Sequence, residues 1–431
     1  YELIVTGGES SQLFINAEDT SEVFDNKGYI IEGPNLFYVT VKFFAGGDYQ
    51  AAGLVSKGEA GLGTEFRVGT FENLGTSQDE YVENFLNFVS VIATQDNTIV
   101  NFSDFGNGVT VVNNTNPEQE ILLDRGDSYI ISIKPCESCP YFGAGSTPNF
   151  SSWDLNSNNE NGLIGTLVQS TKPIVVNSGS LAGSNINFND NDISGQDAGI
   201  DQLVGADKIG NEYIFVRGLG PDEIERPLIV AHEDNTDVSI NGVFYQTIAF
   251  AGEYLSIPTS FYEVSYPSGI YGGDPSNVNA DTDLTNNEPA IGVSSNMYVS
   301  TTKNVFAYQV VGGVRAGTPI ETTWGGTQYT SGVANQGMFF VPPLNCKTPK
   351  SVNNIPYINQ IGTNEFTGVV TIITESNSEL LINGVDISTF NVTPSQVMAN
   401  SNFETYIIEG LTGNITVEST GQVYVASFGA Y

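Results

Sequence analysis

Three short sequence elements recur in the same order three times along the chain, and this repeat constrains the fold more than any other feature. The first element reads LGTEFRV at 62–68, IGNEYIFV at 209–216 and IGTNEFTG at 361–368. The second surrounds Asn97, Asn235 and Asn377. The third covers 170–180, 300–313 and 418–431. A chain with such an internal repeat folds as a series of similar units.

The spacing of these elements predicts the domain organisation. We expect units at 61–180, 209–313 and 361–431, preceded by an incomplete unit at 1–60 and connected by an acidic linking segment at 181–208 and a second linking segment at 314–360. The 431 residues suffice for two to four domains. The sequence ends within a strand-like run, which favours a part of a longer polypeptide.

Within each unit the apolar residues form short runs that are typical of β-strands. Runs such as NFVSVIAT at 87–94 and GVVTIIT at 368–374 are rich in β-branched residues and are separated by Gly, Asn, Asp and Pro. We find no helical pattern longer than two turns. The sequence therefore predicts an all-β fold of tandem β-sandwich-like repeat units, with a β-propeller as the architectural alternative.

The second element contains His232, the only histidine, beside Glu233 and Asp234. This cluster suggests an active or metal site, but only the asparagine persists in all three copies. Asparagine tolerates the left-handed backbone conformation that a tight turn between strands requires. We therefore interpret the stretch around Asn235 as a structural turn.

The charge balance limits the classes of partner. There are 49 acidic and 14 basic residues, giving a formal net charge of −35. Phosphate backbones and anionic lipid surfaces would be repelled, so nucleic acid is not expected as a partner. No apolar run approaches the length of a transmembrane helix, about 20 residues.

Several ordered segments together resemble one known family. The segments NFVSVIATQDNTIVNFS, PLIVAHEDNTDVSINGV and NQGMFFVPPLNCKT are similar to the N-terminal region of large secreted Bacteroidetes surface proteins with gliding-motility-associated C-terminal domains, and to the N-terminal domain of IgGFc-binding protein. The resemblance implies an extracellular, outer-membrane-associated adhesin, stalk or displayed cargo. It implies export by the type IX secretion machinery, and it transfers no catalytic residue.

The acidic linking segment contains the most specific metal pattern. Asp190, Asp192 and Ser194 occupy positions 1, 3 and 5 of a calcium-loop spacing, and Asp201 occupies position 12. Asp281 and Asp283 form a weaker acidic pattern. These residues predict Ca²⁺ as a ligand, and the alternative is a solvated acidic loop.

Aromatic residues in Gly/Ser/Asn-rich segments suggest a second kind of site. Trp153, Trp324 and Tyr271 could stack on sugar faces, and the alternative is that they cover the ends of sandwiches. No GxSxG motif is present, and a Ser/His/Asp triad would need His232. We therefore expect a non-enzymatic surface module whose partners are surface glycans or other cell-surface proteins. A carbohydrate-binding module, or a carboxylate-pair glycan-active enzyme, is the alternative.

Overall fold

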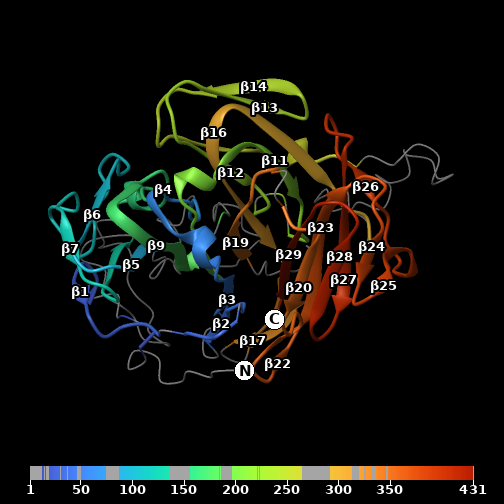
Figure 1. The fold of residues 1–431 in the computed structure, drawn as a ribbon, viewed down its shortest axis with the longest axis horizontal. Helices are drawn as coiled ribbons and strands as arrows, with labels where there is room; N and C mark the ends of the chain where they lie inside the picture. The colour runs from blue at the N-terminus through green and yellow to red at the C-terminus, as the bar shows by residue number, and fades with distance from the viewer. Residues whose placement is uncertain are drawn as a thin grey trace.

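The computed structural model describes residues 19–45 without 30 and 36, 50–73, 87–134, 156–183, 185, 197–264 without 221 and 223, 292–312, 320–324, 327–331, 336–345 and 348–430, and positions 12, 13 and 15. Throughout these residues the chain forms β-strands and short 3-10 turns, with no α-helix. The expected all-β class is confirmed, and the strands gather into curled sheets (Figure 1).

The first curled sheet has eight strands in the order β1-β8-β5-β9-β6-β7, and β4 and β10 also pair with β9. Its strands are β1 (Val23–Phe24), β4 (Gly63–Arg67), β5 (Asn87–Ala93), β6 (Thr98–Ser103), β7 (Ile121–Leu123), β8 (Ser128–Ile133), β9 (Leu167–Gly183) and β10 (Asp197–Gln202). Buried and partly exposed residues alternate along β5 and β6, as the sequence predicts for strands with one face on a core. The 17-residue strand β9 pairs with β6 and β4 along its first half and with β5 and β10 along its second half.

The second curled sheet repeats this topology with seven strands in the order β14-β13-β16-β12-β15, and β11 and β19 also pair with β16. Its strands are β11 (Gly210–Val216), β12 (Pro227–Ala231), β13 (Thr236–Ile240), β14 (Val243–Ile248), β15 (Tyr254–Ser256), β16 (Asn296–Gly312) and β19 (Gln336–Phe340). Strand β16 also has 17 residues and takes the place of β9. We call the parts of the structure built on β9 and β16 units one and two.

Unit three consists of two four-stranded sheets, β20-β28-β24-β25 and β26-β27-β23-β29. Its strands are β20 (Ser351–Ile355), β23 (Thr367–Glu375), β24 (Leu380–Ile382), β25 (Val385–Asp386), β26 (Ser395–Gln396), β27 (Phe403–Leu411), β28 (Ile415–Ser419) and β29 (Val423–Ala430). We call β9 and β16 the closing strands of units one and two. The corresponding strand of unit three is divided into β28 and β29. Strand β20 pairs with β28 in the way that β4 pairs with β9, whereas the segment that matches β4 in sequence forms the small hairpin of β21 (Gln360–Ile361) and β22 (Asn364–Glu365).

The predicted asparagine turn is present in all three units. Asn97, Asn235 and Asn377 have φ angles of 53°, 53° and 64°, in the left-handed region that asparagine tolerates. The second residue after each asparagine donates its backbone N–H to a threonine hydroxyl at the middle of the closing strand. The pairs are Ile99 and Thr171 at 3.0 Å, Asp237 and Thr302 at 2.9 Å, and Glu379 and Thr420 at 2.9 Å. The turn interpretation is thus confirmed.

The remaining elements lie outside these sheets. The hairpin of β2 (Thr40–Ala45) and β3 (Gln50–Val55) lies between units one and three in Figure 1. Lys42 Nζ donates to the carbonyls of Tyr357 and Gln360 at 2.5 and 2.9 Å. The other elements are β17 (Ile320–Trp324), β18 (Thr327–Ser331), η3 (Gly58–Gly61), η7 (Ser157–Asn159), η8 (Ala206–Lys208), η9 (Thr259–Phe261) and η11 (Ile387–Thr389).

The hydrophobic core of unit one extends into unit two, and units two and three each have a core of their own. Phe306 and Tyr308 of β16 belong to the cluster that fills unit one. The Tyr308 hydroxyl donates to the carbonyl of Arg67 at 2.5 Å, and a Cβ at Gly69 would lie 2.3 Å from the Tyr308 ring. Only glycine fits at that position. Unit three contacts unit two through smaller clusters, and this junction contains the cavities described next.

Candidate binding site between units two and three

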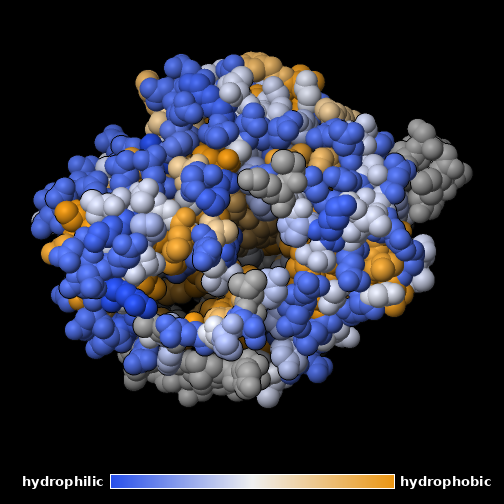
Figure 2. Space-filling view, in the orientation of Figure 1, coloured by the Kyte–Doolittle hydropathy of each residue, from blue (hydrophilic) through white to orange (hydrophobic). Residues whose placement is uncertain are grey.

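Two cavities adjoin at the junction of units two and three. A polar cavity of about 400 Å³ is lined by Glu212, Tyr298, Leu344, Asn345, Ala399, Asn400, Asn402, Phe403 and Gln422. An apolar cavity of about 320 Å³ is lined by Ile214, Val216, Gln309, Phe339, Phe340, Val341, Pro342, Leu344, Thr348, Pro349, Thr371, Ile373, Val423, Tyr424, Val425 and Ala426. Leu344 is a wall of both. Figure 2 shows a hollow at the centre of the molecule, where the three units meet, with apolar residues in its wall.

Strand β11 supplies one side of the junction through its alternating side chains. Tyr213 and Phe215 point into the core of unit two. The alternate residues therefore face unit three, because successive side chains of a strand lie on opposite faces. Glu212 lines the polar cavity, Ile214 packs in the cluster between the units, and Val216 lines the apolar cavity.

Strand β29 supplies the opposite side. Val423 and Val425 pack on the core of unit three. Both valines also border the apolar cavity, which Ala426 lines as well, and Tyr424 joins the cluster of Ile214. Gln422, the residue before β29, lines the polar cavity. We call the surface formed by the two cavities and the cluster between them the junction groove.

The polar end of the junction groove is organised around Tyr298. Its hydroxyl donates to the carboxylate of Glu212, and its backbone N–H donates to Asn241 Oδ1 at 3.0 Å. Burial raises the pKa of Tyr298, and the hydrogen bond to Glu212 and the charge of that carboxylate raise it further. Tyr298 therefore stays a neutral hydroxyl donor.

A strained turn forms the rim of the polar cavity. Ala399 has a φ angle of 62°, which costs about 1–2 kcal/mol in a residue with a Cβ. The turn is closed by hydrogen bonds from Phe403 N to Asn400 O at 3.1 Å and from Val397 N to Phe403 O at 3.0 Å. The turn thereby places Asn400, Asn402 and Phe403 together on the lining.

Comparison with known proteins identifies the family. A family model described as "IgGFc binding protein" matches residues 51–429. The chain belongs to the IgGFc-binding protein family. No curated protein matches it. Among solved structures, an "anti-sigma factor domain-containing protein" aligns with a TM-score of 0.11 and 8% identity over 78% of this chain and 94% of that chain, a similarity too low to indicate a common fold.

The family indicates a non-enzymatic, extracellular binding module, which agrees in general terms with the function expected from the sequence. Among the residues that the structure describes, no helix is long and apolar enough to cross a membrane.

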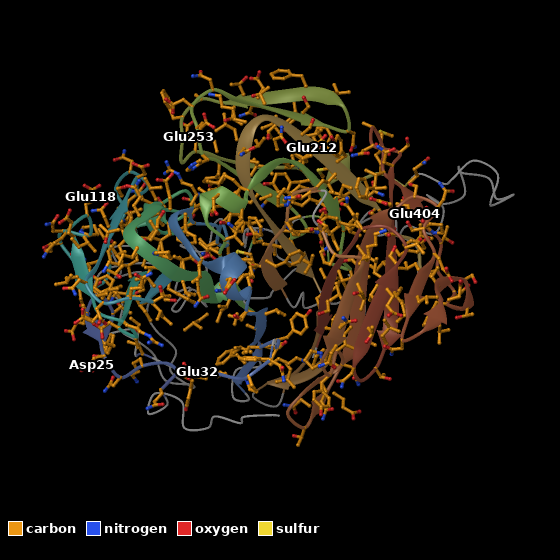
Figure 3. All side chains as sticks on the ribbon, in the orientation of Figure 1. Asp25, Glu32, Glu118, Glu212, Glu253 and Glu404 are labelled. Atoms are coloured by element: carbon orange, nitrogen blue, oxygen red, sulfur yellow. The ribbon has the colours of Figure 1, made fainter. Side chains whose placement is uncertain are left out.

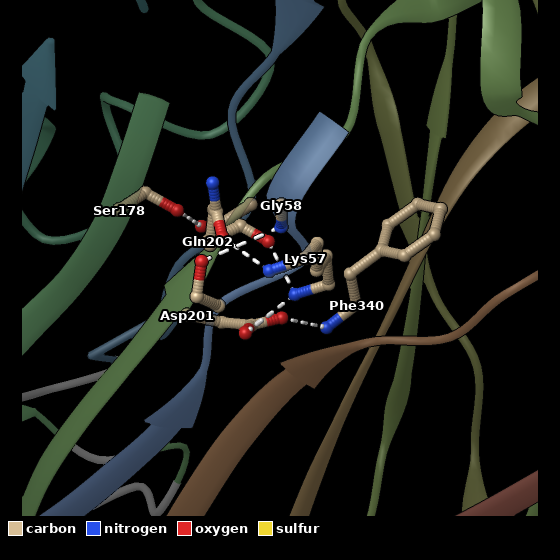
Figure 4. A network of polar contacts seen from close by, with 8 residues as sticks. Lys57, Gly58, Ser178, Asp201, Gln202 and Phe340 are labelled. Carbon is tan, nitrogen blue, oxygen red and sulfur yellow. Dashed lines mark hydrogen bonds and ion pairs between the residues drawn. The ribbon is translucent and has the colours of Figure 1, made fainter. Parts of the chain in front are cut away.

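In this IgGFc-binding family member, Asp201 lies at the junction of units one and two (Figure 4). Its Oδ1 lies 2.7 Å from Lys57 Nζ, and its Oδ2 accepts the N–H of Phe340 at 2.6 Å. Burial raises the pKa of Asp201, and Lys57 and the Phe340 N–H oppose that rise. Asp201 thus ties the N-terminal segment to both units, a role that the calcium-loop pattern does not predict.

The other residues predicted for metal binding lie outside the described residues. These are Asp190, Asp192, Ser194, Asp281 and Asp283. Within the described ranges, no three His, Cys, Asp or Glu side chains are grouped as metal ligands. Calcium binding by the family member stays a prediction.

The aromatic candidates for sugar binding also remain untested. Trp153 and Tyr271 lie outside the described residues. Trp324 ends β17, where its backbone pairs with Thr327, and its side chain is not among those described.

His232 joins units one and two. Its Nε2 lies 3.1 Å from Glu65 Oε1, and its ring packs edge-on against Phe306 with 5.8 Å between ring centroids.

The amide residues of the polar cavity were not predicted from the sequence. Asn400 and Asn402 occur in a stretch that reads as an ordinary turn, and no local signal indicates that they face Glu212.

Proposed function

We propose that this family member is a non-enzymatic attachment module of a secreted surface protein, and that the polar end of the junction groove binds a neutral surface glycan. The observation that carries the proposal is the grouping of Asn345, Asn400, Asn402 and Gln422 around Glu212 and the Tyr298 and Phe403 rings.

The chemistry of this lining suits sugar hydroxyls. A side-chain amide both donates and accepts hydrogen bonds, and an ionised carboxylate accepts them. A sugar hydroxyl does both, so amides and a carboxylate together match a hydroxyl-rich ligand. The net charge of −35 disfavours an anionic ligand. The described lining contributes a single carboxylate, Glu212, whereas glycoside hydrolysis ordinarily uses two.

The wider setting is part of the same proposal. Export by a type IX secretion system, display at the outer membrane and a role in gliding or attachment rest on the resemblance of the repeated segments to Bacteroidetes surface proteins. Ca²⁺ held by Asp190, Asp192 and Ser194 would stiffen the link between units one and two, whereas Asp201 is engaged by Lys57 and the Phe340 N–H.

A glycan array probed with the purified chain tests this function, with and without Ca²⁺. We expect neutral glycans to bind, and Asn402→Ala and Glu212→Ala each to weaken binding about tenfold through loss of one hydrogen-bonding group. Asn211→Ala, on the preceding position of β11, is the matched control because Asn211 does not line the cavity. Binding that is equal in all three variants, or absent from every glycan, would count against the polar cavity as the site.

A protein ligand is the second candidate, favoured by the description of the matching family. The Fc region of IgG, immobilised beside the glycans, tests it. Retention on Fc that survives Asn402→Ala would place protein binding outside the polar cavity.

A further inference from the structure

We infer that the ligand of the junction groove is amphiphilic, with a neutral hydroxyl-rich head in the polar cavity and an aliphatic tail in the apolar cavity. The inference rests on the proposed function for the head and adds the tail. It makes a neutral glycolipid the class of molecule that the groove binds.

The two cavities lie end to end along the same pair of strands. Glu212 and Gln422 line the polar end, Ile214 and Tyr424 pack in the cluster at the middle, and Val216 and Ala426 line the apolar end. The step from Glu212 to Val216 on β11, and from Gln422 just before β29 to Ala426, is four residues, or about 13 Å at 3.3 Å per residue. Leu344 is partly exposed and lines both cavities, so a ligand that passes over Leu344 reaches both ends.

The apolar cavity has few free hydrogen-bonding groups to offer a polar ligand. The Tyr424 hydroxyl accepts from Thr348 Oγ1 at 2.8 Å and from Asn345 N at 3.0 Å. Gln309 Nε2 donates to Val216 O at 2.6 Å. The polar groups on this wall are thus engaged within the protein, and the remaining lining is mainly aliphatic and aromatic. Dry apolar cavities of about 150 Å³ already bind benzene, so one of about 320 Å³ accommodates a short alkyl chain.

The negative charge of the protein favours an amphiphile with an uncharged head. The only carboxylate on the described polar lining is Glu212, which would repel an anionic headgroup, and the net charge of −35 adds to that repulsion. The groove therefore fits an uncharged head rather than a phosphate or carboxylate head.

Alkyl glycosides of graded chain length test the inference. We would measure the affinity of the full chain by calorimetry for methyl, butyl, hexyl and octyl β-glycosides of glucose, galactose and mannose, below their micelle concentrations. We expect the affinity for the bound sugar to rise about fourfold per methylene group, and then to level off once the cavity is full.

Variants at Ala426 test the binding of the alkyl tail separately from the binding of the sugar head. Ala426 pairs with Thr371 of β23, and both residues line the apolar cavity. Ala426→Phe fills the cavity, so it should abolish the gain with chain length and leave the affinity for the methyl glycoside unchanged. Ala426→Leu is a smaller change, which can still be measured if the phenylalanine variant does not fold. In this variant the affinity should level off at a shorter alkyl chain.

The outcomes distinguish the inference from the proposed function. Methyl glycosides that bind as tightly as octyl glycosides, or a chain-length gain that persists in both Ala426 variants, would overturn the amphiphile inference and leave glycan binding intact. Failure of every glycoside to bind, with no binding on the glycan array, would overturn both.

Discussion

At the scale of single residues, Glu225 of unit two is a fully buried carboxylate held by glycine backbone. Its Oε1 accepts the N–H groups of Gly220 and Gly312 at 2.9 and 2.6 Å, and its Oε2 accepts that of Gly218 at 2.9 Å. Burial raises the pKa of Glu225 to about 7, although these N–H groups and Arg217 act in the opposite direction. The cost of burying the charge therefore exceeds the stabilisation by its donors.

This pKa predicts a pH dependence of stability. The folded value of about 7 lies above the ordinary value of 4.5, so between them the folded protein binds more protons than the unfolded chain. The free energy of unfolding should therefore fall as pH rises from 4.5 to 7, by up to about 3 kcal/mol from this group, since the two values differ by about 2.5. Urea denaturation across this range measures the slope.

Glu225→Gln supplies the control for that slope. The amide does not titrate, so the variant should lose most of the decline in the free energy of unfolding between pH 4.5 and 7. An unchanged slope in the variant would assign the pH dependence to other buried acids, such as Asp201 and Glu404, whose pKa values burial also raises.

At the scale of elements, the turn that begins with Asn235 tests the physical basis of the repeat. Asn235 has a φ angle of 53°, so we expect Asn235→Ala to lower the free energy of unfolding by about 1 kcal/mol. In Asn235→Gly the folded turn should be as little strained as in wild type, to within a few tenths of a kcal/mol, because glycine adopts this conformation freely. Thermal or chemical denaturation compares them, and a glycine variant as unstable as the alanine variant would show that the side chain, not the backbone, is essential.

These turns also show which parts of the fold the sequence specifies. Strand class and the three asparagine turns depend on local alternation and local backbone preference, so both were predictable. The pairing of β20 with β28 was not, because it joins segments far apart in the chain and no local pattern marks it. The junction groove escaped prediction for the same reason, since β11 and β29 meet only after units two and three have packed together.

At the scale of the whole molecule, the contacts around Asp201 connect the N-terminal segment to units one and two. Gln202 strengthens this connection, since Lys57 N donates to its Oε1 at 2.5 Å. The Lys57 and Asp201 side chains are 23% and 6% exposed, so removing Lys57 would leave a carboxylate with little solvent to stabilise its charge.

Lys57→Met should therefore destabilise this junction by about 2–3 kcal/mol, somewhat below the usual cost of breaking a fully buried pair. Hydrogen exchange at the Phe340 amide and its neighbours on β10 and β19 measures the effect. The double variant with Asp201→Asn should lose less than the sum of the single variants, because it removes the uncompensated charge. If the double variant were destabilised by the full sum of the two single variants, the coupling between Lys57 and Asp201 would be contradicted.

The acidic surface of the whole molecule sets the conditions for ligand binding. Exposed carboxylates lie on all three units and include Glu118 and Glu253, which Figure 3 labels, and Glu418 of unit three. A neutral ligand pays no electrostatic penalty in approaching such a surface, so we expect its affinity to depend little on salt concentration.

The position of the bound ligand on the protein tests whether the polar cavity is the glycan site. A glycan that binds on the array, carrying a photoreactive diazirine, would be crosslinked to the protein and the labelled positions found by mass spectrometry. We predict labelling at the polar cavity, on Glu212, Tyr298, Asn402 or Gln422. Labelling confined to the segments that contain Trp153, Tyr271 or Trp324 would contradict the account.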